Sequence, residues 1–373
     1  MNIKNILVTG GAGFIGSHLV DALISRGCRV RVLDSLDRQI HPSGRLPAYF
    51  NKKAEFIRGN VTRRADWIAA LKDMEAVVHF AAAVGVGQSM YEVARYVHVN
   101  STGTAILLDL LANGKHKLKK MLVAASMSSY GEGIYDCPNC GKVKPSLRSE
   151  EKLKKKDFQV YCPNCQHIVS LLATDENTAQ TANSIYAITK KIQEEMVLNI
   201  GSAYRIPTVA LRFFNVYGPR QSLSNPYNGV AAIFMSRIKN GKAPIINEDG
   251  KQTRDFVHVR DVVEACLASM IKKEADYQVF NVGSGKPVNI AGVAEIIIRL
   301  YHSKVKPEIT GRVRKLDVRH CYADISKISK LLDWTPKISL EAGLKEVIAW
   351  AEDEVAVDRV DQAMRELEKH GLR

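Results

Sequence analysis

Short strand-like runs alternate with segments of helical period along the first 220 residues. The strand-like runs lie at 6–8, 30–33, 55–58, 76–80, 121–125 and 208–213, and helical stretches such as 65–71 and 102–112 separate them. Largely apolar strands that alternate with helices are typical of a parallel sheet covered on both faces. The pattern therefore predicts an α/β fold, with one more strand near 279–282 joining the sheet.

A glycine-rich turn follows the first run. Gly10, Gly13 and Gly16 are spaced G-x-x-G-x-x-G and open a helical stretch, and the second run ends in Asp34. Glycines let the backbone approach a pyrophosphate, and a helix N-terminus supplies free N–H groups and a positive dipole end. An acidic residue at the end of the second strand accepts hydrogen bonds from ribose hydroxyls and repels a 2′-phosphate. The turn predicts a dinucleotide site that prefers NAD to NADP.

A second motif combines a serine, a tyrosine and a lysine. Ser126 follows the run at 121–125, and Tyr186 and Lys190 lie four residues apart at the start of a helical stretch, so they share a helix face. An ammonium near a phenol stabilises the phenolate and lowers the pKa of the phenol. Tyr-x-x-x-Lys alone is common on helix surfaces. Beside a dinucleotide turn, it indicates proton transfer at a hydroxyl while hydride passes to a nicotinamide.

Two Cys-Pro-Asn-Cys pairs, separated by 21 residues, lie between Ser126 and Tyr186. Two such turns supply four thiolates for tetrahedral zinc, at Cys137, Cys140, Cys162 and Cys165. Four protein sulfurs leave no position for water, so we expect a structural zinc in a basic ribbon too poor in apolar residues to fold alone. A vestigial site or redox-active pairs are the alternatives. The position of the ribbon in the sequence suggests a place near the mouth of the active site, as a lid or a partner surface.

The amino-acid composition limits the classes of binding partner that the chain is expected to have. The 373 residues include 53 Lys and Arg against 39 Asp and Glu, a net charge of +14 that suits nucleic acid, an anionic membrane surface or phosphorylated small molecules. The basic runs lack the interleaved aromatics of a nucleic-acid binder, so nucleic acid is not favoured. With no 18-residue apolar window and no signal-peptide pattern, we expect no membrane partner and a cytoplasmic location.

With these motifs in place, the chain resembles the extended short-chain dehydrogenase/reductase family, the NAD-dependent nucleotide-sugar epimerases and dehydratases. The resemblance also involves Asn100 and the stretches 79–83 (HFAAA), 212–220 (RFFNVYGPR), 254–261 (RDFVHVRD), 280–285 (FNVGSG), 323–324 (AD) and 334–336 (WTP). It implies a Rossmann-type doubly wound parallel sheet with a smaller α/β substrate domain, into which the zinc ribbon is inserted.

The resemblance also implies residue roles. Tyr186 would be the base, Lys190 would lower its pKa and hold the nicotinamide ribose, and Ser126 would contact the reacting hydroxyl. The residues implied to bind NAD are Gly10, Gly13, Phe14, Ile15, Gly16, Asp34, Asn60, Val61, Phe80, Ala81, Ala82, Asn100, Tyr186 and Lys190. Those implied to bind substrate are Ser126, Ser128, Asn215, Arg220, Arg254 and Arg314, with Asn215 on a phosphate and Arg254 and Arg314 facing the diphosphate.

Two positions depart from the family pattern. Asn60 stands where relatives usually carry Asp, and an amide oxygen can still accept from the adenine amino group. Arg314 begins Arg-Lys-Leu-Asp where relatives read Arg-x-Gly-Asp.

The two positions after Ser126 bear on which reaction of the family the chain would catalyse. Dehydratases of the family carry Asp-Glu where this chain has Met127 and Ser128, neither of which is a carboxylic acid. This disfavours dehydration and favours 4-epimerisation through a 4-keto intermediate. The ribbon and neighbouring motifs resemble most the subgroup of dTDP-L-rhamnose 4-epimerases. The alternatives are a UDP-glucose or other UDP-hexose 4-epimerase, a nucleotide-sugar dehydratase or decarboxylase, and a nucleotide- or RNA-binding protein that has lost catalysis.

The expected organisation has four parts. These are an NAD domain at 1–136 and 169–220, the ribbon at 137–168, a nucleotide-sugar domain at 221–352 with segments returning to the first sheet, and a C-terminal helix at 353–373. Val357, Val360, Met364 and Leu367 have heptad-like spacing in that tail, which predicts docking on its own domain or a dimer contact. Relatives commonly pair through the helix after Asn100 and the Tyr186 helix, so the resemblance implies a homodimer.

Overall fold

A seven-stranded parallel sheet forms the centre of the molecule in the computed structural model, which describes residues 3–227 and 229–373. Its order is β13-β9-β5-β4-β1-β2-β3, and the strand order reverses between β1 and β4. The strands are β1 (Asn5–Thr9), β2 (Arg29–Asp34), β3 (Glu55–Arg58), β4 (Ala76–His79), β5 (Lys120–Ser126), β9 (Thr208–Phe213) and β13 (Gln278–Val282). The predicted Rossmann-type doubly wound sheet is confirmed, including its late edge strand.

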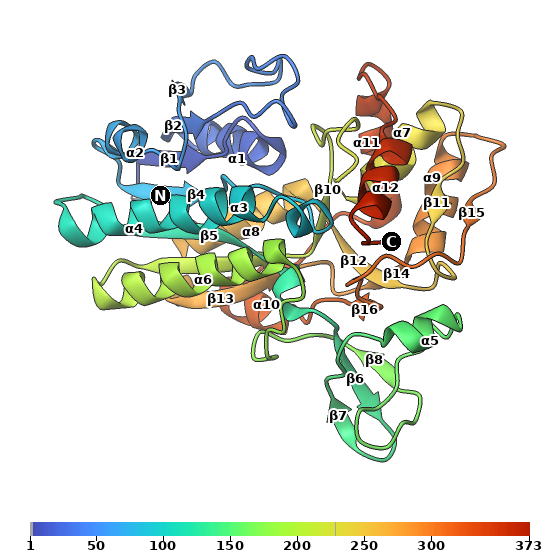
Figure 1. The fold of residues 1–373 in the computed structure, drawn as a ribbon. Helices are drawn as coiled ribbons and strands as arrows, with labels where there is room; N and C mark the ends of the chain where they lie inside the picture. Colours follow the sequence, from blue (N-terminus) through green and yellow to red (C-terminus); the bar gives the residue numbers. More distant parts are fainter. Residues whose placement is uncertain (1–2, 228) are drawn as a thin grey trace.

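Helices cover both faces of this sheet (Figure 1). α1 (Phe14–Ser25) and α8 (Val259–Ile271) pack on one face, and α2 (Arg64–Leu71), α4 (Gly103–Asn113) and α6 (Ile185–Ala203) pack on the other. Alternate side chains of β1 point to opposite faces, so Ile6 and Val8 join the first core and Leu7 the second. Burial on both faces explains why these strands read as continuous apolar runs. The short α3 (Val93–Tyr96) leads into a π-helical segment, η2 (Val97–Thr102), before α4.

A smaller α/β region follows the sheet and has its own core. Its strands are β10 (Asn215–Tyr217), β12 (Thr253–His258), β14 (Pro287–Asn289) and β16 (His320–Cys321), with a separate pair β11 (Ile245–Ile246) and β15 (Glu308–Ile309). Its helices α7 (Val230–Lys239), α9 (Ile290–Leu300) and α11 (Leu340–Ala351) supply most of the apolar side chains of that core. α10 (Ser326–Leu332) instead packs on the large sheet, with Ile328 and Leu332 in its core.

The insertion is a three-stranded antiparallel ribbon that projects from the body of the molecule (Figure 1). β6 (Ile134–Cys137) pairs with β7 (Gly141–Val143) on one side and with β8 (Ser170–Leu172) on the other, and α5 (Glu150–Lys154) lies between β7 and β8 in sequence. The ribbon is therefore longer than the predicted 137–168, because β6 begins at Ile134 and β8 extends it to Leu172. The predicted division of the chain into an NAD domain, a ribbon and a nucleotide-sugar domain stays a prediction.

The tail is only partly helical. α12 spans Val360–Lys369, whereas the predicted helix began at 353. Before Val360, Asp358 pairs with Arg237 and Lys242, and the same two side chains also pair with Asp361 in the first turn of α12. Within the described residues, no helix is both long and apolar enough to cross a membrane.

Candidate active site

A cavity of about 1060 Å³ lies between the carboxyl ends of the large sheet's strands and the smaller region. Ligands of open α/β sheets bind at this edge, near the point where the strand order reverses. The cavity brings together nearly all of the predicted NAD and substrate residues, namely Gly10, Gly13, Phe14, Ile15, Gly16, Asp34, Asn60, Val61, Phe80, Ala81, Ala82, Ser126, Ser128, Tyr186, Lys190, Asn215, Arg220, Arg254 and Arg314. Asn100 is the exception and lies behind the wall.

The glycine turn leaves bare backbone at one end of the cavity. Gly10 has φ +69°, a left-handed conformation that side chains disfavour, and a Cβ there would meet the backbone of Ala81. A Cβ on Gly16 would overlap the carbonyl oxygen of Gly10. Gly13 stands at the N-cap of α1 without a side-chain cap. The first turn of α1 therefore faces the cavity with free N–H groups, as a pyrophosphate site requires.

Two polar side chains stand beside this turn. The Asp34 carboxylate accepts the backbone N–H groups of Ala12 at 3.1 Å and Leu36 at 2.9 Å, which fixes it at the end of β2. Asn60 accepts the N–H of Thr62 through its side-chain oxygen at 3.0 Å. These bonds hold both side chains at the cavity wall, where Asp34 can accept from ribose hydroxyls.

Ser126 and Tyr186 meet at the end of β5. The Ser126 hydroxyl accepts the N–H of Ser128 at 3.2 Å and lies 2.8 Å from the Ser128 hydroxyl. Ser184 caps α6 by accepting the N–H of Ala187 at 3.2 Å, which places Tyr186 in the first turn of that helix. Burial raises the pKa of the Tyr186 phenol, and its hydrogen bond with Ser126 acts in the opposite direction.

Lys190 lies beneath Tyr186 in a buried polar network. Its ammonium donates to Gln193 Oε1 at 2.9 Å, the Gln193 amide donates to Thr104 at 2.7 Å, and Thr104 contacts His79 at 3.0 Å. Burial lowers the pKa of Lys190 to about 7. The sequence predicted that Lys190 lowers the pKa of Tyr186. In the structure burial has the largest effect on Tyr186, and the described ammonium bond goes to Gln193.

Asn100 orients the wall from behind. It lies in the π-helical segment η2, fully buried, and exchanges two hydrogen bonds with the backbone of Ala83 at 2.8 and 3.1 Å. Its amide also donates to Thr189 at 3.0 Å, one residue from Lys190. Asn100 thereby joins the 81–83 loop to α6.

A single carboxylate, that of Asp317, bonds two of the arginines that line the cavity. Asp317 accepts Arg254 Nη2 through Oδ1 at 2.8 Å and pairs with Arg314 Nη2 through Oδ2 at 3.1 Å. Burial by itself would raise the pKa of Asp317, but the neighbouring arginines lower it overall. The Arg-Lys-Leu-Asp sequence that departs from the family pattern thus still places Arg314 beside Arg254.

Asn215 and Arg220 differ in their surroundings. Asn215 Oδ1 is buried and has no hydrogen-bond partner among the described residues, so it is free for a ligand. Arg220, in contrast, pairs with Asp21 of α1 at 2.7 Å and covers the ring of Tyr49 at 5.0 Å. It lies toward the dinucleotide turn and away from Arg254 and Arg314.

The four cysteine sulfurs of the ribbon lie within 4.8 Å of one another, with Cys137 and Cys165 sulfurs 3.4 Å apart. Zn–S bonds of about 2.3 Å in a tetrahedron separate the sulfurs by comparable distances, so the set fits zinc. The residues that line the active-site cavity include Gly131 and Asn183 but none from the described stretch 132–182. The ribbon thus does not contribute to the wall of this cavity in the structure.

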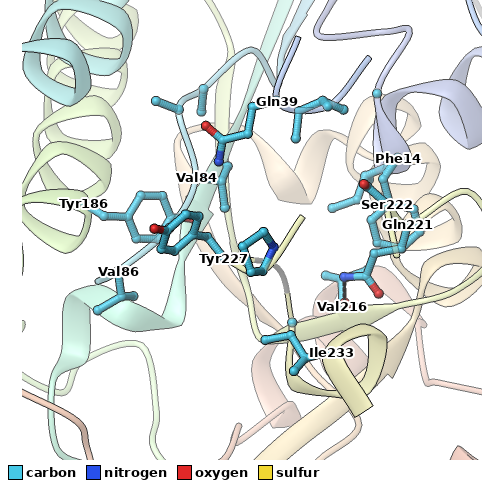
Figure 2. A pocket seen from close by; sticks show the side chains of 18 of the residues that line it. Phe14, Gln39, Val84, Val86, Tyr186, Val216, Gln221, Ser222, Tyr227 and Ile233 are labelled. Carbon is cyan, nitrogen blue, oxygen red and sulfur yellow. Dashed lines mark hydrogen bonds between the residues drawn. The ribbon is translucent and has the colours of Figure 1, made fainter. Parts of the chain in front are cut away.

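Sequence reasoning missed two parts of the wall. α12 contributes Ala363, Met364 and Leu367, and Tyr227 lines the same cavity as Tyr186, Val84 and Val86 (Figure 2). Tyr227 contacts Tyr91 at 2.6 Å between hydroxyls, and the Tyr91 ring stacks on His370 at 4.5 Å. The heptad-like tail predicted a buried face, but its docking site depends on contacts distant in sequence.

Residues 6–283 match the NAD dependent epimerase/dehydratase family. The dTDP-L-rhamnose 4-epimerase of Burkholderia thailandensis is 35% identical over 354 residues, which cover 94% of this chain and 96% of that protein. A crystal structure of UDP-glucose 4-epimerase with UDP-glucose from Thermotoga maritima superposes with a TM-score of 0.77 at 32% identity, over 94% of this chain and 99% of that one. The UDP-glucuronic acid 4-epimerase of Bacillus cereus, in complex with UDP-glucuronic acid and NAD, gives 0.74 at 27% identity, over 94% and 99%.

Proposed function

The chain belongs to the NAD dependent epimerase/dehydratase family, and from that premise we propose that it inverts the configuration at C4 of a nucleotide sugar. Membership confirms the resemblance drawn from the sequence motifs and the prediction of an epimerase-type enzyme. The observation that supports the proposal is a single cavity lined by the glycine turn, by Ser126 and Tyr186, and by Arg254 and Arg314.

The residues at the glycine turn fit NAD. The bare backbone of the glycine turn, the uncapped first turn of α1 and the fixed Asp34 carboxylate match a pyrophosphate followed by a ribose. Bound NAD supplies the acceptor for the C4 hydride and returns it. Gly10, Gly13, Gly16 and Asp34 would hold the dinucleotide, and Lys190 would hold its nicotinamide ribose.

Tyr186 would remove the proton of the sugar 4-hydroxyl and later return it, while Ser126 bonds the same oxygen. Arg254, Arg314 and Asn215 would anchor the diphosphate during the turn of the 4-keto sugar. Inversion requires a fixed nucleotide and a free sugar, because the two faces of C4 would have to be presented in turn to the same hydride carrier while the 4-oxygen stays within reach of Tyr186. Met127 and Ser128 provide no carboxylic acid for dehydration.

We propose dTDP-L-rhamnose as the substrate. The support is the 35% identical relative of that name and the pair Val84 and Val86 beside Tyr186, an apolar wall that suits a 6-deoxy sugar (Figure 2). UDP-glucose is the second candidate, because the relative solved with that ligand shares the fold across nearly the whole chain.

A panel of dTDP- and UDP-sugars, read by NMR for inversion at C4, tests both the reaction and the substrate. Tyr186→Phe should retain NAD and lose about 10³-fold in kcat, since it removes the proton-transfer group and little volume. A variant that inverts C4 at the wild-type rate would show that Tyr186 is not the base. Salt-dependent RNA retention without turnover of any sugar would instead favour a binding protein.

We further propose that the ribbon holds one structural zinc and that the chain forms a homodimer through α4 and α6. Ile188 of α6 and Val97 of η2 are exposed large apolar side chains on this side of the molecule, as an unpaired interface would leave them. Ile188→Lys should therefore convert a dimer to a monomer in light scattering. A wild-type chain that is monomeric at micromolar concentration would contradict the pairing.

A further inference from the structure

The loop from Arg314 to His320 lies between the cavity and the ribbon. Arg314, Leu316, Asp317 and Val318 line the cavity. The other side of the loop contacts residues of the inserted segment, which the functional assignment leaves without a role. This shared loop gives the ribbon a direct physical connection to the site.

On the cavity side, the loop fixes Arg254. Its guanidinium donates to the Asp317 carboxylate and to the backbone carbonyls of Val318 at 2.8 Å and Arg319 at 3.2 Å. The Asp317 carboxylate also pairs with Arg314. The direction of both guanidiniums therefore depends on the position of Asp317.

On the far side, Arg148 of the inserted segment holds Asp317. Its guanidinium donates to both carboxylate oxygens of Glu248 at 2.7 and 2.9 Å and to the Asp317 carbonyl oxygen at 3.2 Å. The Arg148 and Glu248 side chains are 4% and 2% exposed, and neither lines the cavity. A two-pronged buried ion pair of this kind fixes geometry as well as charge.

Two further groups join the loop to the base of the ribbon. Glu132 accepts the backbone N–H groups of Arg319 and His320, each at 2.8 Å. Arg319 in turn donates to Glu248 at 2.8 Å. The loop is thus attached to the inserted segment through Glu132 and Arg148, with Glu248 shared between Arg148 and Arg319.

We propose that Arg148 is a positioning residue for nucleotide-sugar binding, through which the ribbon sets the Asp317 loop so that Arg254 and Arg314 face the substrate diphosphate. This inference rests on the proposed function. Arg148 acts through Asp317 and does not touch the substrate. The ribbon thereby has a task in substrate affinity, distinct from the hydroxyl chemistry at Tyr186.

Arg148→Met tests the role, because Glu248 keeps Arg319 as a partner and the buried site receives a side chain of similar length. KM for the nucleotide sugar should rise about tenfold, and kcat should change by less than about twofold, with NAD retained. Arg148→Lys keeps the positive charge but loses the two-pronged guanidinium that bonds both carboxylate oxygens of Glu248. This variant should therefore restore the affinity for the nucleotide sugar only in part.

Lys120→Met is the matched control. Lys120 forms a buried ion pair with Asp276 at the opposite end of β5, so this variant should lower Tm without raising KM. A folded Arg148→Met protein with wild-type KM, or with a KM shift no larger than that of Lys120→Met, would overturn the inference.

Calorimetric titration with UDP and dTDP separates this outcome from failure of the proposed reaction. If no sugar is epimerised, but wild type binds a nucleoside diphosphate more tightly than Arg148→Met, the positioning role stands and the reaction assignment falls. Equal nucleotide affinity of the two proteins would overturn the positioning role whatever the reaction.

Discussion

The polar side chains of the cavity differ in whether other protein groups already fill their hydrogen-bonding capacity. Asn100 is fully engaged by the Ala83 backbone and the Thr189 hydroxyl, so it shapes the wall, whereas Asp34 is fixed by two backbone N–H groups and can still accept from a ribose. Asn215 Oδ1 is buried without a described partner, which is costly unless a ligand supplies the missing bond. A buried polar atom without a partner therefore indicates a ligand contact more directly than the presence of its residue in a sequence motif.

Asn215→Ala should raise KM for the nucleotide sugar about tenfold, because it removes the amide N–H that would donate to a phosphate oxygen together with the buried Oδ1 that is left for a donor group of the ligand. Asn215→Asp should raise it further, because a carboxylate repels the diphosphate. Steady-state kinetics check both variants. Asn113→Asp, at an exposed helix end, serves as a control. Equal KM values for Asn215→Asp and wild type would remove Asn215 from the substrate site.

Among the helices and strands, those that depend on local sequence pattern could be predicted, whereas those that depend on long-range packing could not. The strands β3 and β9 and the start of α6 follow from apolar runs and a serine cap, all of which are local. The first and last strands of the ribbon and the contact site of α12 do not follow from the sequence, because they depend on pairing between β6 and β8 and on contacts with Tyr91. The motif residues converged on one cavity since the carboxyl ends of parallel strands share an edge.

The ribbon itself has a small apolar core, centred on Tyr135, Val143 and Val160 with the cysteines. Cys162→Ser should therefore remove one zinc per chain, measured by atomic emission, and lower the Tm of the ribbon. NAD content should stay unchanged, because no ribbon residue lines the dinucleotide end of the cavity. Cys28→Ser, outside the cluster, should keep its metal. A wild-type protein purified without zinc and with an unchanged Tm after zinc addition would contradict the site.

The molecule as a whole buries several neutral histidines. Burial lowers the pKa of His79 and His320 to about 3 and that of His258 to about 4, with smaller contributions from nearby cations. The unfolded chain protonates all three near pH 6.5, whereas the folded chain does not. Stability should be complete above that pH and be lost as the pH falls, because the unfolded state then binds more protons.

Between pH 6.5 and 4.5 the free energy of unfolding should fall with a limiting slope on the order of 4 kcal/mol per pH unit, before most carboxylates titrate. Urea unfolding at a series of pH values measures the slope. His258→Asn should reduce it by about a third, because its amide can still cap α8 but does not titrate. His370→Asn, at an exposed site, should not change it. A pH-independent stability across this window would contradict the neutral burial of the three rings.

The pairing of Ile134 with Leu172 brings the entry and exit of the ribbon side by side. A segment joined through such a stem can be added to or deleted from a gene without moving the strands on either side, because the two ends already meet. Excision would nonetheless remove Arg148 and leave Glu248 with Arg319 alone. A shortened chain would keep its fold. It would need a compensating substitution near Glu248 to regain its affinity for the nucleotide sugar.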